Sequence, residues 1–249
     1  MYCRAVWGLV LCLAAPSVLG QEAPTTYVFG TYYRCNEALE DRADALFKET
    51  AAPLYKKEVA AGRIGAYGWG KHWLGGEWRR LEYSTGRDLD KMVDARQAVI
   101  DGLLKDQRKA TDEFSTICSS HDDYIWASVV SSQAPDAIAA SRAAVASSTY
   151  FQCDASREEE ADEIVKAAYA PILNQHVKEG KIVSWNWMRH VMGGEYRRIL
   201  VFDGKDHKSV LGYWSALANG LSAAHPRQAD RFSSICSSHT DYVWEIPKD

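Results

Sequence analysis

The spacing of apolar residues predicts a strand and then a helix at the start of the pattern. Residues 27–35 are rich in aromatic and β-branched side chains, which is typical of a strand. Apolar residues then recur every three to five positions through residues 43–59. This spacing predicts a helix that must kink or restart at Pro53. The apolar positions are Ala43, Leu46, Phe47, Thr50, Leu54 and Val59.

The next elements are two strands, a helix and a short strand. The extended runs 64–73 and 78–83 flank two glycines, which is typical of a tight hairpin. A second amphipathic helix is expected with Asp88 as its N-terminal cap, and a last strand is expected at 123–126. Strand, helix, strand, strand, helix, strand is the ferredoxin-like order.

Residues 31–126 and 149–244 are two copies of one unit. They align at a constant offset of 118 without a gap, and 35 of the 96 aligned pairs are identical. Every element expected in the first copy is therefore expected in the second. The predicted fold class is α+β, with ferredoxin-like repeats at 25–126 and 147–249 joined by an Ala/Ser-rich linker at 127–146.

The first twenty residues have the pattern of a signal peptide, with Arg4 followed by an apolar run from Ala5 to Leu19. The run is shorter than the about 20 residues that a membrane-spanning helix needs. We therefore expect a soluble, secreted or periplasmic protein that does not contact the membrane once residues 1–20 are removed. The net charge of −4 argues against a nucleic-acid partner.

Cys35, Cys118, Cys153 and Cys236 remain after removal of the signal peptide, and four cysteines allow three pairings. Each copy carries one early and one late cysteine, so a single ancestral unit could pair Cys35 with Cys118 and Cys153 with Cys236. The ferredoxin-like order also brings the end of the first strand beside the start of the last one. An oxidising compartment favours these disulfides, and four buried free thiols are the alternative.

Two fused ferredoxin-like units with aromatic-rich sheets resemble the dimeric α/β-barrel superfamily, in which two sheets face one another, usually from two chains. The resemblance covers nearly all of the mature chain and rests on element order and duplication. It implies a pseudo-dimeric α/β barrel within one chain, and hence a monomer with an internal pseudo-two-fold axis. It does not imply one activity, because the superfamily includes cofactor-independent monooxygenases, haem-degrading enzymes and chlorite dismutase-like proteins.

The hairpin pattern His-x-x-Gly-Gly-Glu-x-Arg-Arg occurs in both copies. With the glycines as the turn, His72 lies opposite Arg79, and strand alternation places Glu77 on the same face. An imidazole could transfer a proton while a carboxylate orients it, so the catalytic candidates are His72, Glu77, His190 and Glu195. The competing interpretation is an exposed hairpin whose charges pair with one another. One histidine and one carboxylate per copy are too few for a zinc site, so no metal is expected.

The other hairpin face carries large aromatic residues and an arginine. In a barrel of two facing sheets they could line the interior and bind a flat, partly apolar molecule. The competing interpretation is that they fill the core, with each arginine stacked on a tryptophan. The ligand-binding candidates are Tyr67, Trp69, Trp78, Arg80, Trp185, Trp187 and Arg198.

The remaining histidine patterns do not identify a reaction. His121 and His239 each lie near a serine and an aspartate, but close neighbours in sequence rarely form a triad. There is no Cys-x-x-Cys-His haem motif, and we expect no cofactor. The predicted function is binding of a small, partly apolar molecule between the sheets. The alternatives are a cofactor-independent monooxygenase or isomerase that uses the same cavity, and a protein-interaction module that uses the hairpins.

Overall fold

The computed structural model describes residues 25–132 and 144–247, so the signal peptide expected at residues 1–20 lies outside the described residues. The strands in the described residues are β1 (Tyr27–Arg34), β2 (Ala66–Gly75), β3 (Arg80–Gly86), β4 (Ser120–Ser131), β5 (Val145–Gln152), β6 (Ser184–Met192), β7 (Arg198–Gly204) and β8 (Ser238–Glu245).

Helices lie between the first and second strands and between the third and fourth strands of each repeat. In the first repeat they are α1 (Glu40–Leu46), α2 (Ala52–Ala60), α3 (Leu89–Asp106) and α4 (Arg108–Ile117). In the second repeat they are α6 (Glu158–Ile164), α7 (Ala170–Lys178), α8 (His207–Ala224) and α9 (Pro226–Ile235).

The first helical segment of each repeat continues past its proline. The π turn Phe47–Ala51 joins α1 to α2 directly before Pro53, and Val165–Tyr169 joins α6 to α7 before Pro171. A π turn widens the helix where proline can donate no hydrogen bond, and the helical segment continues through it instead of ending. The expected cap of α3 is confirmed, because the Asp88 side chain accepts the N–H of Lys91 at 3.2 Å.

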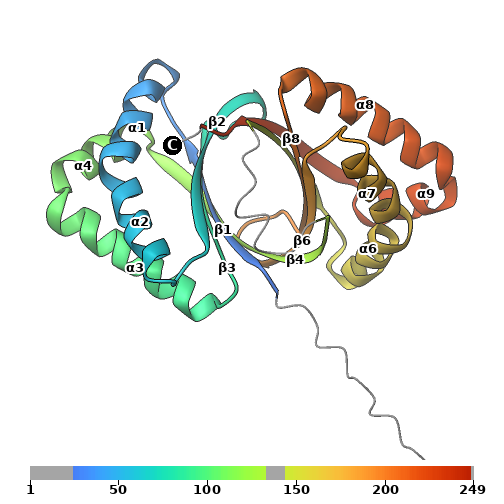
Figure 1. Ribbon diagram of the computed structural model, residues 1–249, viewed down its shortest axis with the longest axis horizontal. Coiled ribbons are helices and arrows are strands. Elements are labelled where there is room, and N and C mark those ends of the chain that lie inside the picture. The colour runs from blue at the N-terminus through green and yellow to red at the C-terminus, as the bar shows by residue number, and fades with distance from the viewer. Residues whose placement is uncertain (1–24, 133–143, 248–249) are drawn as a thin grey trace, which may run out of the picture.

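The strands form one closed barrel (Figure 1). Their order is β1-β3-β2-β8-β5-β7-β6-β4, all pairs are antiparallel, and β4 pairs back to β1. The prediction of two tandem ferredoxin-like repeats whose two facing sheets form a pseudo-dimeric α/β barrel is therefore wrong. Strands β2 and β4, the expected edges of the first sheet, pair instead with β8 and β6 of the second repeat. Closure removes the unpaired backbone groups that a separate sheet would expose at its edges.

The two pairings between repeats, β2 with β8 and β4 with β6, are the seams of the barrel. Both contain shifts in register, whereas the pairings within each repeat are regular. Strand β4 continues to Ser131 and β5 begins at Val145, so both ends of the range 127–146, expected to be a linker, belong to strands. Residues 133–143 of that range lie outside the described residues.

Helices α1–α4 cover one side of the barrel and α6–α9 cover the opposite side (Figure 1). Side chains alternate along each strand, so one set points into the barrel and the other packs beneath the helices. The inward set forms a core of its own, and the outward set forms a core with the helices of each repeat. None of the described helices combines the length and the apolar character needed to cross a membrane.

The predicted disulfide pairing is confirmed. Cys35 is bonded to Cys118, and Cys153 is bonded to Cys236, with Cα atoms 3.9 Å apart in each pair. Each bond joins the residue after the first strand of a repeat to the end of its last helix. Both cross-links therefore lie within one repeat.

Loss of either disulfide should lower the free energy of unfolding. The bonded cysteines are separated by 83 positions. A cross-link over a loop of that length lowers the entropy of the unfolded chain, which stabilises the folded state by about 4–5 kcal/mol. We expect this decrease for the double substitution Cys35→Ala with Cys118→Ala, measured by urea denaturation. A decrease below about 1 kcal/mol would show that the bond does not constrain the unfolded state.

Candidate functional site

The barrel is plugged by aromatic rings at the end that carries the hairpin turns. Trp78 stacks on Tyr32 at 4.3 Å and on Tyr242 at 5.0 Å between ring centroids, and Tyr124 and Tyr196 meet its edges. Trp78, Tyr124 and Tyr242 are almost fully buried. The rings therefore fill the interior at this end, and a surface hollow of about 410 Å³ lies over them, bordered by Trp78, Tyr124 and Tyr242.

The rest of the barrel interior contains a cavity of about 140 Å³. It extends towards the end of the barrel where β2 and β6 begin, at Ala66 and Ser184. Its walls are mostly apolar, with tyrosine, serine, threonine and asparagine side chains and the Asp203 carboxylate, which accepts a hydrogen bond from Ser184, between them. The inward residues that line it include Val28, Tyr32, Leu81, Tyr83, Trp126, Ser148, Tyr150, Asn186, Met188, Ile199, Val201, Trp244 and Ile246.

Two equivalent tryptophan–tyrosine pairs in this lining differ in their hydrogen bonds. The indole Nε1 of Trp126 donates to the Tyr32 hydroxyl at 3.3 Å. In the second repeat the indole Nε1 of Trp244 has no hydrogen-bond partner, although the side chain is fully buried. The Tyr150 hydroxyl lies near those of Tyr32 and Ser148 but makes no hydrogen bond of normal geometry.

Burial keeps the tyrosines of the cavity protonated. It raises the pKa of Tyr32 and of Tyr150 well above the usual value for a phenol. Each neutral hydroxyl can therefore donate one hydrogen bond and accept others at physiological pH. Tyr32 and Tyr150 consequently offer uncharged hydroxyl groups to the cavity.

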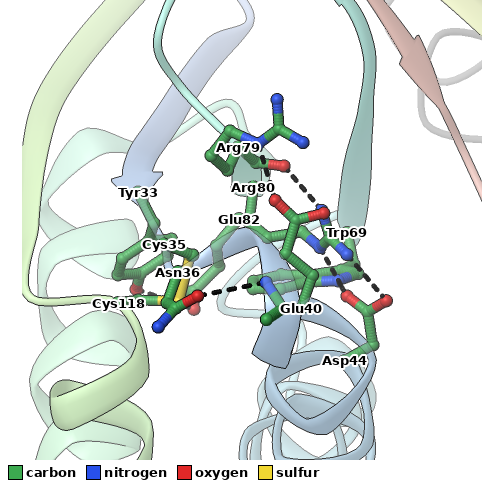
Figure 2. The surroundings of a disulfide bond; sticks show 11 residues. Tyr33, Cys35, Asn36, Glu40, Asp44, Trp69, Arg79, Arg80, Glu82 and Cys118 are labelled. Carbon is green, nitrogen blue, oxygen red and sulfur yellow. Dashed lines mark hydrogen bonds and ion pairs between the residues drawn. A yellow bond between two sulfur atoms is a disulfide. The ribbon is translucent and has the colours of Figure 1, made fainter.

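The arginines and two of the tryptophans expected inside the barrel lie outside it, beneath the helices. Arg80 binds Asp44 through Nε at 2.6 Å and Nη2 at 3.0 Å, and Glu40 through Nη1 at 2.9 Å (Figure 2). Trp69 donates its indole N–H to Asp44 at 2.8 Å. We refer to Arg80, Glu40, Asp44 and Trp69 as the first clamp, because they fix α1 to the sheet.

The second repeat contains the same arrangement. Arg198 binds Asp162 at 2.7 and 2.8 Å and Glu158 at 2.8 Å, and Trp187 donates to Asp162 at 2.7 Å. We call these four residues the second clamp. Arg80 and Arg198 are only 3% and 2% exposed, so each clamp is a buried ion pair. The expectation that both arginines and Trp69 and Trp187 line the barrel is corrected by this placement.

The carboxylates explain why the arginines point outward. Burial alone would raise the pKa of Asp44, but hydrogen bonds from Arg80, Lys71 and Trp69 outweigh it and lower that pKa. Glu40 and Asp44 are four residues apart, one turn of helix, and the same spacing recurs at Glu158 and Asp162. This repeated pair was the sequence signal that could have identified the clamps.

The other three ligand-binding candidates lie in different places. Trp78 is inside the barrel, in the plug. Tyr67 and Trp185 contribute to the open end of the cavity, but their rings point outward. The Tyr67 ring stacks on Tyr55 at 5.3 Å, and the Trp185 indole donates to Asn174 at 2.9 Å.

The hairpin candidates do not form one catalytic group. His72 lies opposite Arg79 as predicted, since its N–H donates to the Arg79 carbonyl at 3.0 Å. Its Nδ1 is 2.9 Å from Arg79 Nη1, and because arginine can only donate, the proton of the neutral ring is assigned to Nε2. Arg79 pairs with Glu40, whereas exposed Glu77 pairs with Arg34 at 2.7 Å.

His190 has the same environment, with Nδ1 3.0 Å from Arg197 Nη1, and Glu195 is exposed at the hairpin turn. Burial and the adjacent arginine lower the pKa of both His72 and His190, and neither ring lines the barrel cavity. Both Nε2 atoms are buried without a partner. Within residues 25–132 and 144–247, no cluster of three or more His, Cys, Asp or Glu side chains could hold a metal ion.

The Glu82 carboxylate, which is mostly covered by its neighbours, has no counterpart in the second repeat. Glu82 accepts hydrogen bonds from the hydroxyls of Tyr33 and Tyr55, and Arg96 lies 3.8 Å away. The equivalent residues, 118 positions later, are Leu200, Phe151, Leu173 and Trp214. Burial raises the pKa of Glu82 despite these hydrogen bonds and the arginine.

No protein-family model and no curated protein sequence matches this chain. A solved structure of a putative monooxygenase from Lactobacillus acidophilus NCFM is 7% identical, with a TM-score of 0.56 over 89% of this chain and 94% of that one. An anthrone oxidase-like protein is 12% identical, with a TM-score of 0.58 over 91% and 93%. A haem-binding protein from Thermus thermophilus is 9% identical, with a TM-score of 0.50 over 90% and 93%. These similarities concern the fold alone, and they are consistent with a resemblance to the dimeric α/β-barrel superfamily.

Removing the arginine of a clamp should destabilise the protein strongly. Arg198→Met would leave Glu158 and Asp162 without their buried cation, which costs about 3–5 kcal/mol. We expect a decrease of that size in the free energy of unfolding, measured by urea denaturation. Arg189→Met, on an exposed side chain of the adjacent strand, should change it by less than about 0.5 kcal/mol. Equal effects of the two substitutions would contradict a structural role for the second clamp.

The buried Glu82 carboxyl should make stability decrease as pH rises. Its pKa is raised in the folded state, so the ionised form is less favourable there than in the unfolded chain. This loss of stability is absent well below the usual carboxyl pKa of about 4.3. It grows as the pH rises from there through the raised pKa of Glu82 in the folded state. Glu82→Gln should therefore gain stability over the wild type between pH 4 and pH 7, measured by urea denaturation at both pH values. A gain that is equal at the two pH values would contradict the raised pKa.

Proposed function

We propose that this protein binds one small, planar, mostly apolar molecule in the barrel cavity. The cavity carries the proposal, because filled interiors are usual and a void of about 140 Å³ inside a packed barrel is not. An engineered protein cavity of about 150 Å³ with apolar walls binds benzene. The expected ligand is therefore about the size of one aromatic ring with a few substituents.

The composition of the walls supports the same class of ligand. Leu81, Ile199 and Val201 offer apolar surface, and the faces and edges of Trp126 and Trp244 suit an aromatic ring. Ser148, Asn186 and the Asp203 carboxylate add a few polar atoms, which is the usual pattern of small-molecule sites.

The similar solved structures are compatible with this proposal and with an enzymatic alternative. Two of them are described as a putative monooxygenase and an anthrone oxidase-like protein. An enzyme that used His72 or His190 as a base would need the imidazole at the ligand, but neither ring lines the cavity. Binding is therefore the function that the geometry favours.

Haem, which the Thermus thermophilus protein is described as binding, does not fit this cavity. About 140 Å³ is well below the roughly 300 Å³ at which pockets for drug-sized molecules begin, and no histidine is among the described residues that line it. We propose a ligand without a metal, and a monomeric, exported protein, in keeping with closure within one chain and with two disulfides.

Toluene and phenol are suitable probes, since each is one ring in size. We expect saturable binding of at least one of them, with one site per chain, measured by isothermal titration calorimetry. Val201→Phe should weaken binding about tenfold or more, because the added ring takes up cavity space. The strand should tolerate this ring, since Tyr83 occupies the equivalent position in the first repeat.

Val93→Phe serves as the matched control, because Val93 lies on α3 and is 48% exposed. It should leave binding unchanged. If neither probe binds the wild type, or if both substitutions weaken binding equally, the barrel cavity is not the binding site.

A further inference from the structure

The barrel cavity has one charged group in its lining. Of the described residues that line it, Asp203 is the only one with an acidic or basic side chain. Ile199, Val201 and Asp203 alternate along β7, so the carboxylate points into the barrel as the two apolar side chains do. Asp203 lies at the open end and is partly exposed, although its backbone pairs with β5 and β6 on its two sides. The exposed part is therefore the side chain, which a molecule in the mouth of the cavity can reach.

The fold does not require this carboxylate. Asp203 lies opposite Ser184 on the neighbouring strand and accepts a hydrogen bond from its hydroxyl. The first repeat forms the same pair of strands with Thr85 and Ala66 at these two positions. The strands therefore pair without an acid, and the presence of Asp203 needs an explanation other than the pairing.

The two sides of the cavity mouth have diverged in the same sense. Asn186 on β6 also lines the cavity, and its side-chain oxygen accepts the Ser128 hydroxyl at 2.7 Å. The equivalent of Asn186 is Gly68, where a Cβ atom would be only 2.3 Å from the Tyr83 hydroxyl oxygen. One side of the mouth therefore offers an aromatic ring, and the other offers polar groups and a negative charge.

The chemistry of a carboxylate indicates what the polar end of a ligand should carry. A carboxylate can accept about four hydrogen bonds, so the bond from Ser184 does not exclude others. A charge beside apolar walls is stabilised by an opposite charge that also donates hydrogen bonds to it. A primary ammonium group supplies both, with three N–H donors. An anionic ligand would be repelled, and a neutral ligand would bring no opposite charge.

We propose that the cavity selects planar molecules that carry a primary amine, with the ring among the apolar walls and the ammonium group at Asp203. This inference rests on the proposed function, since it names the ligand class of the same cavity. Asp203 then determines the charge of the ligand, and the cavity volume of about 140 Å³ determines its size.

Benzylamine and benzyl alcohol test this proposal, because they carry an ammonium group and a hydroxyl group on the same ring and methylene. The wild type should bind benzylamine about tenfold more tightly than benzyl alcohol at pH 7, measured by isothermal titration calorimetry. Asp203→Asn keeps an acceptor for Ser184 and removes the charge. We expect it to weaken benzylamine binding about tenfold and to change benzyl alcohol binding less than about twofold.

Glu245→Gln is the matched control, because it removes a negative charge at the same end of the barrel. Glu245 follows the inward Trp244 on β8, so its side chain points away from the cavity, and it lies 3.2 Å from His207. The substitution should leave the ratio of the two affinities unchanged.

Two further measurements cover the case in which Asp203→Asn fails to fold. Asp203→Thr introduces the residue that the first repeat holds at the equivalent position, Thr85, and should abolish the preference for benzylamine in the same way. In the wild type, benzoate should bind about tenfold more weakly than benzyl alcohol, because its charge has the same sign as that of Asp203.

The outcomes separate the two proposals. If the wild type binds none of benzylamine, benzyl alcohol, toluene and phenol, both proposals are overturned. If it binds a neutral probe as tightly as benzylamine, the selection for amines is overturned and the cavity remains a binding site. A preference for benzylamine that persists in Asp203→Asn and Asp203→Thr, or that is lost equally in Glu245→Gln, overturns the assignment to Asp203.

Discussion

Closure of the barrel is the constraint on which the other features depend. Neither repeat could keep its four strands as a separate sheet without exposing the backbone groups of two edges. The seams remove these edges by pairing β2 with β8 and β4 with β6. Closure also turns one face of every strand into an interior shared by both repeats, which is why rings from both halves meet in the plug and around the cavity.

The clamps decide which face of each strand becomes that interior. Burial of an arginine is unfavourable unless its charge is paired and its N–H groups are bonded. Asp44 and Glu40 meet both needs from α1, and Asp162 and Glu158 do so from α6. With Arg80 and Arg198 held under the helices, the alternating neighbours Leu81 and Ile199 point into the barrel.

Local features could be predicted from the sequence. Which face of each strand points into the barrel could not. The hairpin register, the Asp88 cap and the disulfide pairs follow from turn chemistry, capping and duplication, which act within one repeat. Alternation divides a strand into two faces but does not say which face the helices cover. Trp69 and Trp126 are both large aromatic residues, yet one lies beneath a helix and the other inside the barrel. The pairing of strands between the repeats could not be predicted either, because the residue pattern of each repeat indicates where its own strands lie but not which strands of the other repeat they pair with.

The positions of the disulfides divide the molecule into two covalently reinforced units. Cys35–Cys118 and Cys153–Cys236 each tie a first strand to the helical layer of the same repeat, and neither bond crosses a seam. The disulfides therefore limit how far the chain of each repeat can extend when it unfolds, but they do not hold the two repeats together. Resistance to a pulling force across the seams comes from backbone hydrogen bonds and from the interlocked rings of the plug, so the barrel should part between its repeats before either repeat loses its own strands.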